Sequence, residues 1–163
     1  MARFSTFVLF TLLALPVSAQ EEPSVQIRLL NAELSQQLAG AAMTACRKQG
    51  YQVAVAVVDR AGNLQAFVRD PLAGPHTIDV SLGKAYAAAS FQTATTQMMD
   101  NELLRHAPRV LLIGGGLPVV IGGHMYGALG VSGAPARKRT GDVDEECAQA
   151  GIDAIREELE FAQ

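Results

Sequence analysis

Two different spacings of apolar residues alternate along this chain and divide it into helices and strands. Over residues 31–49, apolar side chains recur every three to four positions, at Leu34, Leu38, Ala41 and Ala45. This spacing predicts an amphipathic helix. Asn31 can cap its first turn through its side chain, and Gly50 can end it.

The segment after this helix predicts a pair of strands. Val53–Val58 and Leu64–Val68 are short runs rich in β-branched and other apolar residues. Between them, the Asp59 side chain can bond back to the backbone of the turn, and Gly62 can take a positive φ. We therefore expect an antiparallel hairpin.

Helical spacing returns twice more. After a proline-containing loop, Thr77 can cap a second helix whose apolar face consists of Ile78, Leu82, Ala85 and Ala89. The alanines on this face indicate close packing on a flat surface. A more polar helical piece is expected around Met98–Leu104. The last helix begins near Asp142, which can cap it while Glu145 reaches back, as in a capping box.

A glycine-rich stretch, GGGLPVVIGGHMYGALGVSGAP, occupies residues 114–135. Its two β-rich runs, Pro118–Ile121 and Tyr126–Val131, predict a second hairpin. Gly122 and Gly123 lie between the runs and can supply the unusual backbone angles of the turn.

The order helix, hairpin, helix, hairpin, helix predicts an α/β (α+β) fold in which an antiparallel sheet is flanked by helices. With 163 residues, 49% of them hydrophobic and 18% charged, the chain can bury one core. We therefore assign residues 31–163 to a single domain and residues 20–30 to an N-terminal extension.

Residues 1–19 have the features of a secretory signal peptide. Arg3 is their only charged residue, Phe7–Leu15 is an apolar run, and Val17 to Ala19 are small residues before a cleavage site. The run is short for a membrane span; an uncleaved anchor or a buried first helix is the alternative. We expect cleavage after Ala19 and a periplasmic or secreted mature protein.

Removal of this segment leaves 12 basic and 16 acidic residues, a net charge of −4. Nucleic-acid binding calls for a positive surface. The basic cluster Arg137-Lys138-Arg139 is flanked by Pro and Gly, as is typical of a solvated loop. The composition therefore argues against a nucleic-acid partner.

Export would allow the two cysteines, Cys46 and Cys147, to pair in an oxidising compartment. Both fall on the apolar sides of the first and last predicted helices, which can share one face of a central sheet. We predict a structural disulfide between them. Two separate buried thiols are the alternative.

The glycine density of residues 114–135 does not match the common ligand-binding motifs. A dinucleotide fingerprint starting at Gly114 fails because Val119 stands where its third glycine would be. A nucleophile elbow around Ser132 fails because Ala134 replaces its second glycine. We therefore expect these glycines to be needed for the backbone conformation and not for ligand binding.

The three histidines have no spacing that would place two metal ligands on one helix face, so a dedicated zinc site is not expected. They are His76, His106 and His124. His76 stands out by its position, between a proline loop and the alanine-rich helix, where it can present an imidazole to a flat ligand. The alternative is an ordinary surface or capping histidine.

Four successive motifs of the chain resemble those of the GlcG/HbpS-type family, also called DUF336, which is related to the C-terminal domain of PduO. The motifs are VAVAVVDRAGNLQAFVRD, HTIDVSLGKAYAAASF, GGGLPVVIGGHMYGALGVSGAP and DEECAQAGIDAI. The resemblance covers about residues 30–160. It implies a profilin-like fold, formation of homo-oligomers, and haem binding, with extracellular or periplasmic examples.

The resemblance therefore implies an exported haem-binding module acting as a carrier, a buffer or a sensor input. Family members use a histidine near the first helix as axial ligand, but residues 31–50 contain none. We expect His76 to hold the haem iron instead. Arg69 and Lys84 are candidates to meet the propionates, and the alternative is that both are ordinary surface or helix residues. The alternative iron ligands are His124, Met125, Met98 and Met99.

A second class of function stays open: an enzyme or binding protein for a small organic acid or another small molecule, in a pocket shaped by the glycine-rich hairpin. The sequence contains no recognisable nucleophile, no pair of catalytic bases and no metal-binding cluster, which favours binding over catalysis. We therefore assign no catalytic residue. The expected partners are a small-molecule ligand and copies of the same chain, without nucleic acid and, after signal cleavage, without a membrane.

Overall fold

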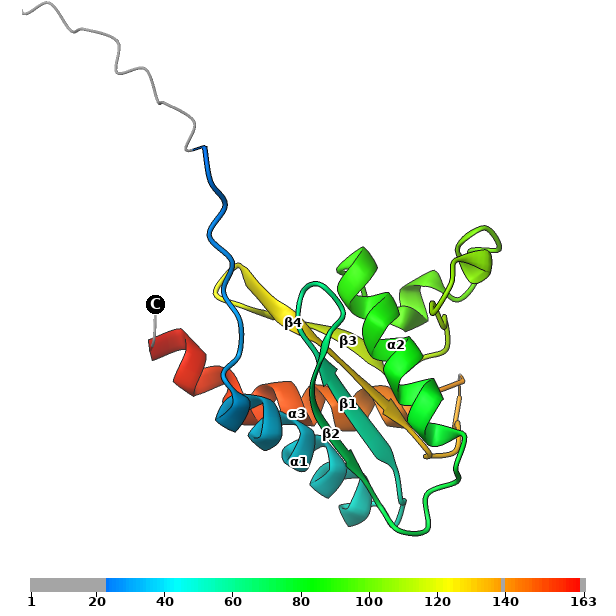
Figure 1. Cartoon of the computed structure of the whole chain (residues 1–163). Coiled ribbons are helices and arrows are strands. Elements are labelled where there is room, and N and C mark those ends of the chain that lie inside the picture. Colours follow the sequence, from blue (N-terminus) through cyan, green and yellow to red (C-terminus); the bar gives the residue numbers. More distant parts are fainter. Residues whose placement is uncertain (1–22, 139, 162–163) are drawn as a thin grey trace, which may run out of the picture.

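A four-stranded antiparallel sheet lies at the centre of the structure, a computed structural model that describes residues 23–138 and 140–161 (Figure 1). The elements are α1 Ala32–Lys48, β1 Ala54–Val58, β2 Leu64–Arg69, α2 Thr77–Phe91, β3 Gly116–Ile121, β4 His124–Ser132 and α3 Asp142–Phe161. The strands pair in the order β2-β1-β4-β3, which confirms the predicted fold class. The predicted signal peptide lies outside the described residues. Within them, no helix has the length and apolar character needed to cross a membrane.

β1 alternates valine with alanine, and this alternation separates the two layers around the sheet. Val55 and Val57 belong to the core shared with α1 and α3, whereas Ala56 packs with Ala85 and Ala88 of α2. α1 and α3 lie side by side on one face, and α2 covers the other (Figure 1). Because small side chains meet on the α2 side, this helix can lie close to the sheet.

Glycines of the predicted second hairpin make this close approach possible. A Cβ on Gly130 of β4 would come within 2.6 Å of the Ala85 backbone nitrogen and still closer to the Ser81 carbonyl oxygen. In the turn, Gly122 and Gly123 have φ values of 56° and 77°. The prediction that these glycines serve backbone geometry is confirmed.

Gly130→Ala should therefore lower the free energy of unfolding by about 1–3 kcal/mol or more, because the added methyl group meets helix backbone. Gly40→Ala is the matched control, since nothing lies within 4 Å of a Cβ at this position in α1. Alanine is favoured over glycine inside a helix by about 1 kcal/mol, so this variant should gain stability. Urea unfolding followed by circular dichroism measures both changes, and equal stability of the two variants would contradict the close approach.

The starts of the first two helices differ in how they are capped. Asn31 Oδ1 accepts a hydrogen bond from the Leu34 N–H at 2.8 Å, as predicted for α1. The predicted Thr77 cap is wrong, because this hydroxyl donates to the Gly74 carbonyl oxygen at 2.6 Å. Thr77 thus ties the preceding loop to the first turn of α2.

The capping box predicted for the last helix is also wrong. Asp142 is the first residue of α3, and its carboxylate accepts hydrogen bonds from the backbone N–H groups of Arg137 and Lys138. Glu145 Oε1 accepts a hydrogen bond from the Thr96 hydroxyl at 3.0 Å. Both carboxylates therefore bind neighbouring loops, which hold the start of the helix in place.

Two further expectations for the helices are corrected. Instead of one helical piece at residues 98–104, the chain forms 3₁₀ turns at Thr95–Met98 and Leu104–His106. The buried face of α2 includes Ser81 but not Ile78, which is 37% exposed. The close contact with β4 selects small side chains for that face, so the larger Ile78 side chain is left outside.

The predicted disulfide is confirmed. Cys46 near the end of α1 is bonded to Cys147 in the second turn of α3, with their Cα atoms 5.4 Å apart. Both residues are fully buried. The bond joins the two helices that cover one face of the sheet.

Candidate functional site

The residues predicted to bind a ligand lie at opposite ends of the sheet. Arg69 ends β2 beside the loop that carries His76, whereas His124 and Met125 begin β4 at the end where both hairpin turns lie (Figure 1). The five residues of β1 separate these ends, at about 3.3 Å per residue. The structure therefore does not bring the two histidines into one site.

Lys84 lies in the core, away from any incoming ligand. Its side chain is 2% exposed, and its ammonium donates to the Asp144 carboxylate and to the Val131 carbonyl oxygen, both at 2.8 Å. Burial lowers the pKa of Lys84 and raises the pKa of Asp144, while their mutual attraction opposes both shifts. Because a propionate would reach this ammonium only by opening the core, Lys84 is not kept in the ligand site.

The methionines considered as iron ligands are mainly core residues. Met98 is 8% exposed and Met125 is 7% exposed. Met125 packs in the small cluster between α2 and the sheet. His124, in contrast, is exposed at the tip of the β3–β4 hairpin. Of the residues first considered for iron, His76 and His124 are exposed, whereas Met99 is half-buried.

The loop between β2 and α2 is anchored at its start. The Asp70 carboxylate accepts hydrogen bonds from Arg47 Nε at 2.7 Å and from the Val53 N–H at 3.0 Å. Arg69 donates through its guanidinium to the Ala73 carbonyl oxygen. Its Nε is buried and has no hydrogen-bond partner within residues 23–138 and 140–161. Arg69 therefore retains one donor for which an acceptor is missing.

The His76 imidazole is exposed and rests against Gly74. A Cβ at Gly74 would come within 2.7 Å of His76 Cε1 and 2.8 Å of Nδ1, but would be 3.8 Å from Nε2. His76 has helical backbone angles, φ −62° and ψ −23°, directly before α2. Its side chain therefore continues the surface pattern of that helix, with Nε2 farther from the glycine than Nδ1.

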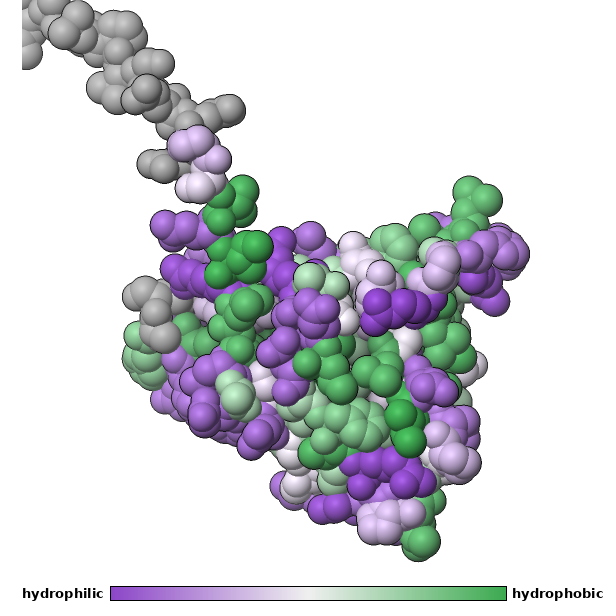
Figure 2. Space-filling view, viewed as in Figure 1, coloured by the Kyte–Doolittle hydropathy of each residue, from purple (hydrophilic) through white to green (hydrophobic). Residues whose placement is uncertain are grey.

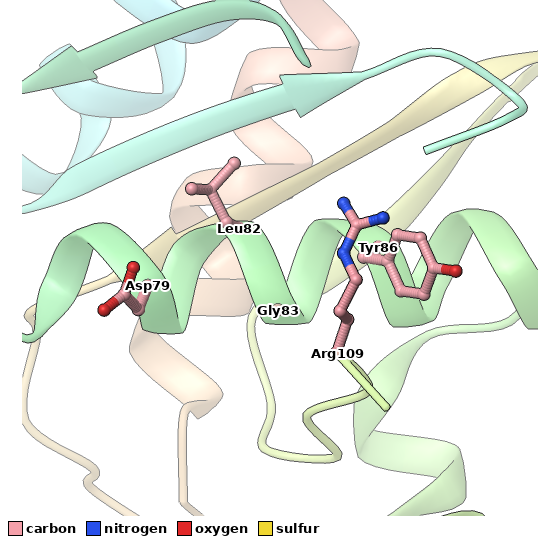
Figure 3. Close-up of a pocket in the computed structure, with 5 residues that line it drawn as sticks. All are labelled: Asp79, Leu82, Gly83, Tyr86 and Arg109. Atoms are coloured by element: carbon pink, nitrogen blue, oxygen red, sulfur yellow. The ribbon is translucent and has the colours of Figure 1, made fainter. Parts of the chain in front are cut away.

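A cavity of about 290 Å³ lies along the outer surface of α2 (Figure 3). It is lined by Asp79, Leu82, Gly83, Tyr86 and Arg109. In Figure 3 the Arg109 side chain extends from a neighbouring loop towards the Tyr86 ring, and its guanidinium carbon lies 4.1 Å from the ring centroid. This is a cation–π contact, worth about 0.5–1 kcal/mol at an exposed site. The cavity thus combines an aromatic ring with one positive and one negative side chain, Arg109 and Asp79.

The backbone around Arg109 is fitted closely to α2. Arg109 has a φ of 67°, in the left-handed region that residues other than glycine rarely adopt. A Cβ at Gly83 would lie 3.0 Å from Leu111 Cβ and 3.5 Å from the Arg109 carbonyl oxygen. The absence of a side chain at Gly83 therefore lets this loop approach the helix and places Arg109 at the cavity.

The histidine and the cavity share one stripe of α2. Residues three or four apart along a helix form a row on its surface, and this row contains His76, Asp79, Gly83 and Tyr86. Beside it, Ile78 is exposed, and Leu82 and Phe67 are partly buried against the small cluster between α2 and the sheet. Figure 2 shows hydrophobic side chains gathered on this face of the molecule. We refer to the row, Arg109 and these three apolar residues as the α2 surface.

Tyr86 and Arg109 were not predicted from the sequence. Tyr86 is the one aromatic residue within the alanine-rich run of α2, ten residues after His76, and this spacing could have placed it on the same stripe. Arg109 lies in an irregular loop, and no local pattern predicts its approach to the helix. Among the described residues, no group of three or more His, Cys, Asp or Glu side chains could hold a metal ion.

Comparisons with known proteins agree with this fold. The family model described as "Haem degrading protein HbpS-like" matches residues 30–153. An uncharacterised 15.0 kDa protein of Citrobacter freundii, from the dhaT-dhaS intergenic region, is 29% identical over 143 residues, which cover 82% of this chain and 97% of that protein. Protein GlcG of Escherichia coli K12 is 35% identical over 108 residues, which cover 61% of this chain and 81% of that protein.

Two solved structures extend the comparison to three dimensions. A double mutant of Streptomyces reticuli HbpS superposes with a TM-score of 0.75 at 36% identity, covering 87% of this chain and 97% of that one. PduOC, solved as a complex with haem, superposes with a TM-score of 0.70 at 28% identity, covering 78% of this chain and 95% of that one. With its motifs, its sheet and its family match in agreement, the chain belongs to the HbpS-like family.

Proposed function

We propose that this protein is an exported haem-binding module that holds the tetrapyrrole on the α2 surface. Its family and the haem complex of PduOC support haem as the ligand. The observation that carries the proposal for this chain is the position of His76. Its exposed imidazole lies on the same helix stripe as a cavity that contains a tyrosine ring and an arginine.

The residues of the α2 surface fit the chemical parts of haem. Ile78, Leu82 and Phe67 offer apolar contact to a macrocycle, and His76 offers the imidazole that haem iron commonly binds. Arg109 offers a charged donor to a propionate, beside the Asp79 carboxylate of the same cavity. Arg69 is not part of this cavity, because its Nε is buried and its guanidinium donates to the Ala73 carbonyl oxygen. Haem bound there would supply a redox-active iron, and the protein would supply its orientation and its shielding from water.

The size of the cavity favours a ligand shared between copies of the chain. At about 290 Å³ it lies just below the range of small-molecule sites, about 300–1,000 Å³, so one chain encloses only part of a macrocycle. We therefore propose that a homo-oligomer completes the site, with one haem or fewer for each chain.

The disulfide supports the proposal of export. Disulfides persist in oxidising compartments and are rare in the cytosol, and Cys46 and Cys147 are bonded in the core. Together with the signal-like residues 1–19, this favours a periplasmic or secreted haem carrier or buffer.

Titration of the purified mature protein with haemin should give a saturable shift of the Soret band. His76→Ala should weaken binding about tenfold or more, or change the spectrum, because it removes the iron ligand. His106→Ala is the matched control, since His106 is also exposed but lies outside the α2 surface. An unchanged spectrum and affinity in His76→Ala would reject this ligand. A band that forms and then decays with a reductant would show haem turnover in place of storage.

Gly74→Ala tests the position of the imidazole without removing it. The new methyl group would displace the exposed His76 ring, which can swing away at little cost in stability. We expect an altered haemin spectrum at an almost unchanged melting temperature. Wild-type binding by Gly74→Ala would contradict iron coordination at this position.

A further inference from the structure

A second cavity, of about 210 Å³, lies at the end of the sheet opposite His76. It is lined by Gln26, Arg28, Arg60, Gly123, His124 and Met125. These residues come from three separate segments, namely the chain before α1, the β1–β2 turn, and the β3–β4 turn together with the start of β4. We propose that this cavity, which we call the hairpin cavity, binds a small organic carboxylate.

The hairpin cavity carries positive charge that no ion pair among the described residues neutralises. None of its lining residues is acidic, and the described residues place no ion-pair partner on Arg28 or Arg60. This is notable in a chain whose formal net charge is −3. Two uncompensated guanidinium groups at one concave site attract an anion.

The nearest carboxylate in the sequence, Asp59, is engaged elsewhere. Asp59 Oδ1 accepts hydrogen bonds from the N–H groups of Ala61 and Asn63, at 2.8 and 2.9 Å. Burial alone would raise the pKa of Asp59, but its hydrogen bonds, led by those from Asn63, lower it. The carboxylate is therefore ionised and held inside its own turn, and it leaves Arg60 available to a ligand.

The donors of the hairpin cavity match a carboxylate on a short carbon chain. A guanidinium presents paired N–H groups that fit the two oxygens of a carboxylate. The Gln26 amide and the His124 imidazole add further polar groups at the same site. Met125, 7% exposed, gives the cavity an apolar contribution that suits the carbon chain. The small volume favours an acid of a few carbons over a tetrapyrrole.

Titration of the ¹⁵N-labelled protein with malonate, at constant ionic strength set by chloride, tests this proposal. We expect saturable shifts of the Gly123 and His124 backbone amides. Arg60→Ala should weaken malonate binding about tenfold or more, and Arg60→Lys, which keeps the charge but not the paired donors, should weaken it less. Arg156→Ala is the matched control, because Arg156 lies on α3 and is paired with Asp153 at 3.0 Å; its malonate affinity should equal that of the wild type.

Three results would overturn the proposal. The first is a set of shifts that do not saturate or that spread over all arginines, which would indicate non-specific charge screening. The second is an unchanged malonate affinity in Arg60→Ala. The third is saturation by inorganic phosphate at lower concentration than by malonate, which would assign the site to another anion. Because haem is absent from this experiment, its outcome is independent of haem binding at the α2 surface.

Discussion

Cys46→Ala/Cys147→Ala should lower the free energy of unfolding by about 4–5 kcal/mol. The disulfide joins residues 101 positions apart, and cross-linking a loop of about one hundred residues restricts the unfolded chain by about this amount in the chain-entropy model. The free energy of unfolding of a natural domain is only about 5–15 kcal/mol in total, so the variant should be close to unfolding. Guanidinium unfolding of the variant and the wild type measures the difference.

Reduction of the wild type provides the control for the two alanines. If the cross-link itself causes the stabilisation, unfolding of the wild type in the presence of dithiothreitol should show a loss of unfolding free energy similar to that of the variant. The variant differs from the reduced wild type only by the loss of one sulfur atom from each of the two side chains. A loss below about 1 kcal/mol in both would contradict a stabilising role. Two reactive thiols for each chain, in denatured protein isolated from its native host, would show that the bond does not form there.

Features of the fold that depend on local pattern were predictable from the sequence. The hairpin turns follow from glycines at the required positions, and α1 follows from helical spacing with Asn31 as its cap. The disulfide was also predictable, because both cysteines lie on apolar sides of helices that share a layer. These features require only short-range geometry and the rule that apolar faces pack together.

The candidate site depended on contacts that no local pattern contains. Lys84 stands in an alanine-rich helix, and its burial follows only from meeting Asp144, which is 60 positions away. The loop that carries Arg109 reaches α2 because Gly83 leaves room for it. The Thr77 cap failed for a related reason, since its hydroxyl already serves the Gly74 carbonyl. In each case a long-range or loop contact outweighed the local preference.

Lys84→Met should lower the free energy of unfolding by about 3–5 kcal/mol near pH 8, because it leaves the Asp144 carboxylate buried without its cation. Asp144→Asn should lower the free energy of unfolding by a similar amount, because it leaves the Lys84 ammonium without its negatively charged partner. The double variant should lose less than the sum of the two single losses. Burial lowers the pKa of Lys84 and raises that of Asp144 in spite of their attraction, so desolvation outweighs pairing. The pair is then better understood as a link between α2 and α3 than as a source of stability.

The pH dependence of Lys84→Met identifies the carboxylate as the cause. Without the lysine, burial should raise the pKa of Asp144 further above its usual 3.8, because the opposing attraction is gone. Between the unfolded and folded pKa values, the folded state keeps a proton that the unfolded state has released, so stability falls as pH rises through this interval. The loss relative to the wild type should therefore be larger near pH 8 than near pH 5, as measured by urea unfolding. Lys84→Met/Asp144→Asn lacks the titrating carboxylate and should show no such increase. An equal loss for Lys84→Met at both pH values would mean that Asp144 does not carry the effect.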